Sequence, residues 1–179
     1  RNTGMKKLFL IVFTFVIYSV TCAQFVITPN GYKSEKGEDY IVYEFPAKAK
    51  VELFKAVSTN ILKTMSGSLP AYYSNSEDFI VMTNVVRKFV NKGICALTVE
   101  YILRFAIEEG RVLVYAPEVN FHGTANGAEI LLFPCAGKNW AGRHFYIYSK
   151  EGKLQEKEIK DQIEAYFNKE MTDLIESIK

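Results

Sequence analysis

The sequence predicts an α+β domain in which two helices pack on one face of a curled antiparallel sheet. Three observations support this prediction: period-two alternation over residues 94–108, and helical periodicity over residues 47–65 and 155–177. Along the chain the order is a strand, a helix, several strands joined as antiparallel hairpins, and a final helix. An apolar sheet face and two apolar helix stripes can then bury one another in two layers.

The first strand and the first helix are predicted between residues 40 and 65. Tyr40–Phe45 is rich in β-branched and aromatic residues, which favour a strand, and Pro46 ends it. The helix follows from about Ala47 to Met65, and its apolar residues recur at three- and four-residue spacing. These residues are Leu53, Phe54, Val57, Ile61, Leu62 and Met65. We expect them to share the face that packs on the sheet.

The longest strand is predicted at Ile94–Glu108, after a strand at Phe79–Phe89 and a turn at Asn91-Lys92-Gly93. Its odd-numbered positions from Cys95 to Ile107 are largely apolar. The even-numbered positions include Thr98, Glu100, Arg104 and Glu108. This alternation indicates one dry face and one face that is at least partly in contact with water.

A fourth strand, Arg111 to about Phe121, returns after a two-residue turn at Glu109-Gly110. That turn pairs Glu108 with Arg111, and the register then pairs Arg104 with Tyr115, Ala106 with Leu113 and Thr98 with Phe121. Pro117 leaves an alternative open. A bulge there would exchange the faces of every residue beyond it, because a slip of one residue turns each side chain over.

The remaining elements are a hairpin at Asn126-Gly127, an apolar stretch at Ile130–Phe133 and a short strand at His144–Tyr148. The closing helix runs from about Gln155 to Ser177. Its apolar stripe consists of Ile159, Ile163, Phe167, Met171, Leu174 and Ile178. Its predicted solvent-exposed residues are Lys157, Lys160, Glu164, Asn168 and Glu176.

The N-terminal residues predict export. Lys6 and Lys7 precede an uncharged apolar run, Leu8–Val20, whose 13 residues suit a signal peptide and are too few to span a bilayer. We expect residues 1–4 to be vector or upstream residues, 5–23 a signal peptide cleaved before Gln24, 24–38 an exposed lead-in, and 39–179 a single domain. The alternative is a lipoprotein acylated on Cys22, which the residues before that cysteine fit poorly. The predicted location is the periplasm or the cell surface.

Removal of residues 1–23 takes away three basic residues and no acidic one, which leaves 19 basic and 20 acidic residues. The mature chain therefore carries a formal charge of −1. Such a chain has no general attraction to nucleic acid or to anionic lipid. We expect no nucleic-acid partner and no transmembrane segment in the mature chain; the partner and the oligomeric state stay open.

Several stretches of the sequence together resemble the pattern of a known family. Residues 5–24, Met-Lys-Lys followed by an apolar run that ends at Ala23-Gln24, precede Tyr40–Pro46 and Glu52-Leu53-Phe54. With the hairpin at Glu109-Gly110-Arg111 and the closing Ile163–Asn168, this pattern resembles an exported bacterial family of unknown function, DUF4468. The resemblance covers about residues 38–122 and 150–178. It implies a fold like that of the TATA-box-binding protein (TBP-like) and no established activity, and a fold by itself does not imply DNA binding.

Catalytic and metal motifs are absent from the sequence: there is no phosphate-binding glycine loop, Gly-x-Ser-x-Gly, His-Glu-x-x-His or Cys-x-x-Cys. The sharpest enzymatic alternative is a hydrolase or transferase in which Cys135 is the nucleophile and His122 or His144 is the base. Together with Glu129, these three residues could also bind zinc, but their spacing matches no zinc motif. We therefore expect a non-catalytic protein without cofactor or metal. Whether Cys95 and Cys135 form a disulfide stays open.

The candidate binding surface is the sheet face that the helices do not cover. The predicted register places Arg104, Leu113 and Tyr115 together on it, and tyrosine and arginine are enriched at protein interfaces. This face would bind an envelope protein or ligand. In the alternative arrangement, residues 123–149 fold over the face and bury it.

Overall fold

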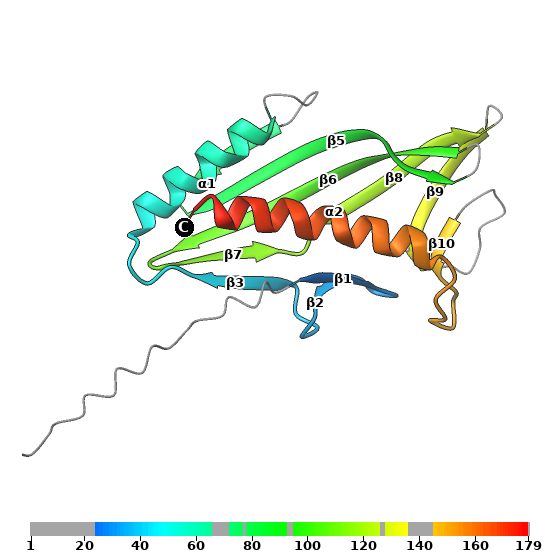
Figure 1. The fold of residues 1–179 in the computed structure, drawn as a ribbon, viewed down its shortest axis with the longest axis horizontal. Helices are drawn as coiled ribbons and strands as arrows, with labels where there is room; N and C mark the ends of the chain where they lie inside the picture. Colours follow the sequence, from blue (N-terminus) through cyan, green and yellow to red (C-terminus); the bar gives the residue numbers. More distant parts are fainter. Residues whose placement is uncertain are drawn as a thin grey trace, which may run out of the picture.

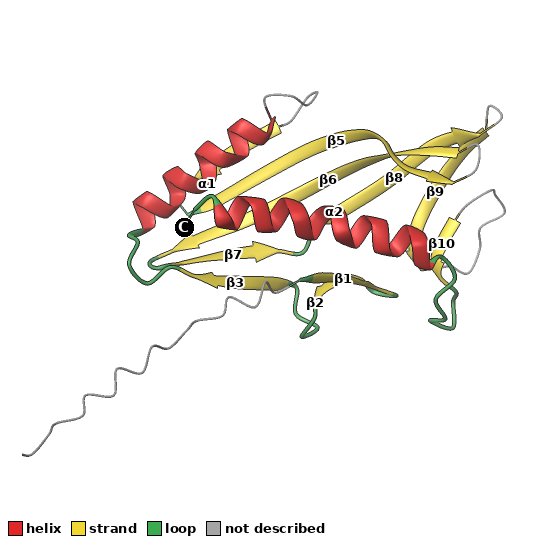
Figure 2. Cartoon of the chain, viewed as in Figure 1, coloured by secondary structure: helices red, strands yellow, loops and turns green. Residues whose placement is uncertain are grey.

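The computed structural model describes residues 24–65, 72–76, 78–92, 95–125, 128–135 and 145–178. These residues form a long, twisted sheet with two helices on one side (Figures 1 and 2). The strands are β1 (Phe25–Thr28), β2 (Gly31–Ser34), β3 (Tyr40–Glu44), β4 (Tyr72–Ser76), β5 (Phe79–Lys92), β6 (Cys95–Glu108), β7 (Arg111–Tyr115), β8 (Glu118–Ala125), β9 (Ala128–Cys135) and β10 (Phe145–Tyr148). The helices are α1 (Lys50–Met65) and α2 (Lys157–Glu176).

Strand β6 is the centre of the sheet. It pairs with β5 along its length on one edge, while β7 and β8 share its other edge. The main order is β10-β9-β8-β6-β5-β4, and β3 adds to the free edge of β7. All of these pairings are antiparallel except that of β9 with β10. The predicted α+β architecture, with both helices on one sheet face, is confirmed (Figure 2).

The core lies between the sheet and the helices. Leu103 and Phe105 of β6 are 1% and 0% exposed, as the alternation predicts. The helices bury Leu53, Val57 and Ile61 of α1, and Ile159, Ile163, Phe167, Met171, Leu174 and Ile175 of α2. Leu62, which was expected in the buried stripe of α1, is 53% exposed. The helix turns it away from the sheet, because the α1 stripe is centred on Leu53, Val57 and Ile61.

A bulge in β5 completes the core near the middle of α2. The register between β5 and β6 shifts between Val86 and Val90, where Lys88 adopts a positive φ of 54°. Within this irregularity Phe89 brings its ring 4.7 Å from that of Tyr166 and 5.9 Å from that of Phe121. The bulge thus directs a strand residue into an aromatic cluster beneath the helix.

The N-terminal segment departs from the prediction. Residues 24–38 were expected to be an exposed lead-in, yet β1 and β2 form a hairpin whose Phe25, Ile27 and Tyr32 are buried. Each strand has only four residues, so alternation at Phe25 and Ile27 is too brief to stand out in the sequence. The prediction of an exposed lead-in is therefore wrong.

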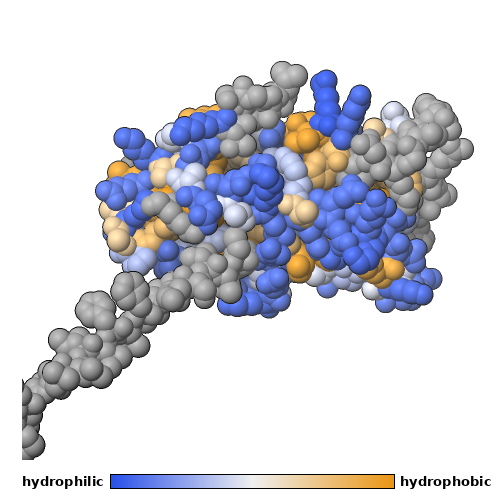
Figure 3. Space-filling model, in the orientation of Figure 1, coloured by the Kyte–Doolittle hydropathy of each residue, from blue (hydrophilic) through white to orange (hydrophobic). Residues whose placement is uncertain are grey.

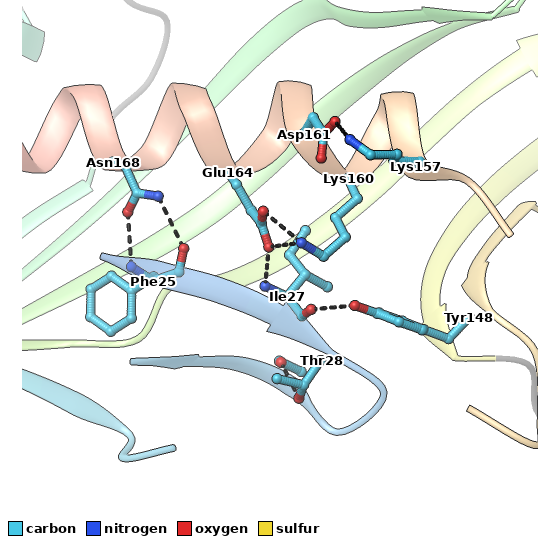
Figure 4. Close-up of polar contacts among 10 residues, drawn as sticks. Phe25, Ile27, Thr28, Tyr148, Lys157, Lys160, Asp161, Glu164 and Asn168 are labelled. Atoms are coloured by element: carbon cyan, nitrogen blue, oxygen red, sulfur yellow. Dashed lines mark hydrogen bonds and ion pairs between the residues drawn. The ribbon is translucent and has the colours of Figure 1, made fainter. Parts of the chain in front are cut away.

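Polar side chains of α2, together with Tyr148 of β10, hold this hairpin (Figure 4). The backbone N–H of Phe25 donates to Asn168 Oδ1 at 2.9 Å, and Asn168 Nδ2 donates back to the Phe25 carbonyl at 3.0 Å. Glu164 accepts from the Ile27 N–H at 2.6 Å, and the Tyr148 hydroxyl donates to the Ile27 carbonyl at 2.7 Å. The backbone N–H and carbonyl groups of Phe25 and Ile27 in β1 are thus hydrogen-bonded by side chains instead of by a neighbouring strand.

Three residues of α2 are consequently less exposed than the helical pattern suggested. Lys160 and Glu164 form an ion pair at 2.6 Å with side chains 18% and 15% exposed, and Asn168 is half-buried. They were predicted to face solvent because their spacing puts them beside the apolar stripe. That side of the helix faces β1 instead.

Neither α1 nor α2, the helices of the described residues, is long and apolar enough to cross a bilayer. The predicted signal peptide, Cys22, the turn at Asn126-Gly127 and His144 all lie outside those residues. The backbone of Cys95 begins β6.

Candidate functional site: the open face of the sheet

The edge of β6 opposite β5 is divided where β7 gives way to β8. Glu108 pairs with Arg111 in β7, but Ile102 pairs with Glu118 in β8, so the register advances by one residue at Ala116-Pro117. The Ala116 N–H does not pair with β6 and donates instead to the Asp39 carbonyl at 2.8 Å. The single fourth strand that was predicted over residues 111–121 is therefore two strands.

The shift corrects part of the predicted register. Ala106 pairs with Leu113 as predicted, and the recorded pairs of β6 and β7 extend to Phe105 and Val114. Thr98 pairs with His122 instead of Phe121. Phe121 is therefore turned to the helix side and buried, which is the consequence expected of a bulge at Pro117.

A hollow of about 620 Å³ lies at this division of the sheet. Arg104 and Tyr115 both line it, so the structure brings these two predicted residues together. Ile102 and Glu118 add to the lining from the same open face. Leu113 is on this face as well, opposite Ala106, but it does not line the hollow.

Tyr115 also belongs to a row of aromatic rings across the strands. Its ring centroid lies 6.2 Å from that of Tyr40 in β3 and 6.0 Å from that of Phe79 in β5. Tyr40 and its open-face neighbour Val42 are 37% and 38% exposed. The hollow is therefore bordered by accessible aromatic and aliphatic surface, which is the composition of many interface centres.

Arg104 is held in place by Glu118. Arg104 Nη1 donates to Glu118 Oε1, and the two side chains are 31% and 58% exposed. This hydrogen bond raises the pKa of Arg104 and lowers the pKa of Glu118. At neutral pH both groups are charged, so the pair presents a fixed guanidinium at the hollow. The sequence reasoning missed Glu118, and Pro117 was the signal that pointed to it, because the register beyond a bulge places Glu118 on the open face.

The described part of segment 123–149 lies beside this face and reaches the hollow only at Pro134. Residues 123–125 continue β8, β9 pairs beside β8, and β10 pairs beside β9, so these strands extend the sheet sideways (Figure 1). The described residues of this segment therefore do not cover Arg104 and Tyr115, as the alternative arrangement had required. On the opposite side of the molecule, hydrophilic residues cover much of the surface around α2, and apolar ones form separate patches (Figure 3).

Of the two alternative catalytic pairs, the one between Cys135 and His122 is not assembled. His122 pairs with Leu131 of β9, and Cys135 is four residues farther along that strand, roughly 13 Å at the usual rise per residue. The Cys135 thiol donates to the Ser149 carbonyl at 3.2 Å. His144 lies outside the described residues, as does any pairing through it. Within the described ranges no three His, Cys, Asp or Glu side chains are grouped so as to hold a metal ion.

Comparisons with known proteins identify the fold. No protein-family model and no curated protein sequence matches the chain. The chain is similar to the crystal structure of a TBP-like protein from Parabacteroides distasonis, with a TM-score of 0.59 and 11% identity over 78% of this chain and 90% of that one. It is also similar to a DUF4468 family protein from Bacteroides ovatus, with a TM-score of 0.54 and 12% identity over 78% of this chain and 83% of that one. The chain therefore has a TBP-like fold, and the predicted resemblance is confirmed at the level of the fold.

Proposed function

We propose that the protein is a non-catalytic binding module of the cell envelope that engages its partner through the open sheet face around Arg104 and Tyr115. One observation carries the proposal. A hollow lined by an anchored arginine and a tyrosine adjoins a row of accessible aromatic side chains, and the described residues leave it uncovered. Arginine and tyrosine supply a disproportionate share of binding energy where they are packed at the centre of an interface.

A catalytic role has less support. The pairing that would activate Cys135 as a nucleophile requires a base within hydrogen-bonding reach. His122 faces a different stretch of β9, and the thiol is engaged with the Ser149 carbonyl. These contacts favour a structural role for Cys135, at the junction of β9 and the segment after β10.

Export is the second part of the proposal, and it rests on the residues before β1. Lys6 and Lys7, the apolar run and the small residues Thr21 and Ala23 suit cleavage before Gln24. Because β1 begins at Phe25, the cleaved chain keeps every strand and helix of the fold. We expect protein secreted by a bacterial host to begin at Gln24 in N-terminal mass spectrometry. A diacylated species that begins at Cys22 would replace this reading with a lipoprotein.

The binding role is tested by affinity capture from envelope extract with residues 24–179 as bait. Arg104→Ala and Tyr115→Ala should each reduce the recovery of the same captured partner. Two variants on the helix side serve as controls: Lys169→Ala, which removes the cation of an exposed ion pair, and Leu62→Ala, which removes an exposed apolar side chain. Equal recovery by all four variants, each folded by circular dichroism, would refute the proposal.

A further inference from the structure

We infer that the partner presents an extended, basic polypeptide segment to the open face, with a lysine or arginine side chain in the hollow. This inference rests on the proposed binding function and specifies the chemistry of the partner. The observations that carry it are the distribution of charge in and around the hollow and the aromatic row beside it.

The hollow is acidic. Three carboxylates line it, those of Asp39, Glu100 and Glu118, against the single guanidinium of Arg104. Glu118 is paired with Arg104, and Asp39 is paired with Lys33 of β2. Glu100 is exposed and has no ion-pair partner among the described residues. A cation entering the hollow would therefore find one carboxylate that the fold has not neutralised.

The open face between the hollow and the β6–β7 turn has the same sign. Arg111, which lies in this region, is paired with Glu108 at the hairpin end. Glu44 of β3, opposite Arg111 in the register, is exposed. Arg104 and Arg111 are thus each paired with a glutamate, and this region carries more carboxylates than guanidinium groups. A nucleic-acid backbone would meet repulsion here, since its binding depends on unpaired lysine and arginine side chains facing the phosphates.

The aromatic row favours the same occupant. A cationic side chain gains energy over the face of a tyrosine ring, and its methylene stem covers apolar surface. Tyr115 lines the hollow. The aromatic row continues from it to Tyr40 of β3 and Phe79 of β5, which lie outside the lining of the hollow. An extended segment can place one side chain at Glu100 and others along this row, because its side chains alternate in direction. A small cation would occupy the hollow and leave the row uncovered.

Two buried tyrosines also line the hollow. Tyr32 and Tyr101 belong to the lining as well as to the core. The Tyr101 hydroxyl accepts from Asn84 Nδ2 at 3.0 Å, whereas the Tyr32 hydroxyl is buried without a hydrogen-bond partner in the described part of the chain. Hydrogen bonding is therefore less complete on this side of the hollow than in the rest of the described core.

The experiment uses residues 24–179 and three end-blocked synthetic peptides, in which valine alternates with lysine, with glutamate or with serine. Binding is followed by isothermal titration at low and at physiological salt. The lysine peptide should bind, and raised salt should weaken it, because exposed charges are screened. Glu100→Gln should weaken binding about two- to fivefold, the range for one exposed ion pair, and Glu100→Lys should weaken it further.

A matched control separates the local carboxylate from net charge. Glu158→Gln and Glu158→Lys make the same charge changes on the exposed side of α2, which lies across the sheet from the hollow, and should leave the affinity unchanged. Failure of the lysine peptide to bind, an equal loss in the Glu158 variants, or binding of a duplex DNA oligonucleotide at this face would overturn the inference. If the glutamate or serine peptide binds instead and Tyr115→Ala abolishes that binding, the inference fails while the binding face stands. If capture from envelope extract is also indifferent to Arg104 and Tyr115, both proposals fail.

Discussion

Asn168 of α2 binds both backbone groups of Phe25, accepting from its N–H at 2.9 Å and donating to its carbonyl at 3.0 Å (Figure 4). A carboxamide has the same donor and acceptor as a peptide group, so this side chain takes the place of a neighbouring strand for the first residue of β1. The contact joins residues 143 positions apart in the sequence. It ties the N-terminal hairpin to the closing helix.

Asn168→Ala should lower the free energy of unfolding by about 1–3 kcal/mol, because it leaves a half-buried N–H and carbonyl of Phe25 without partners. Lys169→Ala, at the next position, removes the cation of an exposed ion pair and should cost less than about 1 kcal/mol. Urea unfolding measures both values, and amide hydrogen exchange should show a faster Phe25 N–H in Asn168→Ala alone. A protected Phe25 amide in that variant would contradict the role given to Asn168.

The sequence predicts those parts of the fold that repeat a pattern over many residues. Residues 94–108 alternate long enough to identify their dry face, and the buried Leu103 and Phe105 confirm it. The β1–β2 hairpin escapes prediction because its strands have four residues each, and its partners on α2 are polar residues that read as solvent-exposed.

The candidate site was predictable in part for a related reason. Register follows from a tight turn, which is why Ala106 pairs with Leu113 as expected. Nothing in the residue pattern decides whether Pro117 keeps or shifts that register. The shift occurs where the Ala116 N–H bonds to the Asp39 carbonyl, a contact between distant parts of the chain. Glu118 could therefore be assigned to the site only from the structure.

Tyr32→Phe and Tyr101→Phe should differ in their effects on stability, and only Tyr101→Phe should lower it. The Tyr32 side chain is buried, and its hydroxyl has no partner in the described structure, so its removal relieves a desolvation cost. We expect Tyr32→Phe to leave stability unchanged or to raise it by about 1 kcal/mol. Tyr101→Phe removes the acceptor of the buried Asn84 amide and should cost about 1–3 kcal/mol. Equal losses in the two variants, measured by urea unfolding, would show that the Tyr32 hydroxyl is satisfied in solution.

Glu170 should make the protein less stable as pH rises through the weakly acidic range. Burial raises its pKa above the usual 4.5, and nearby Asp173 adds to the increase while Lys169 opposes it. The folded state therefore keeps a proton that the unfolded state releases, so stability falls between pH 4.5 and the raised pKa. Glu170→Gln should remove this slope and stabilise the protein at neutral pH.

The control for Glu170 is Glu158→Gln, on the exposed side of the same helix. Unfolding free energies across the acidic range should have the same slope in this variant as in the unsubstituted protein. A slope that survives in Glu170→Gln would assign the effect to another group.

The two faces of the sheet are compared most directly by the unfolding free energies of Leu103→Ala and Arg104→Ala. These neighbours on β6 point to opposite faces: Leu103 is buried against the helices, whereas Arg104 lines the open hollow. Leu103→Ala should lose about 2–5 kcal/mol, as expected for emptying a core position. Arg104→Ala should lose less than about 1 kcal/mol, since it removes a partly exposed side chain and its ion pair with Glu118. A loss at Arg104 as large as that at Leu103 would mean that the open face is covered in solution and cannot be the binding surface.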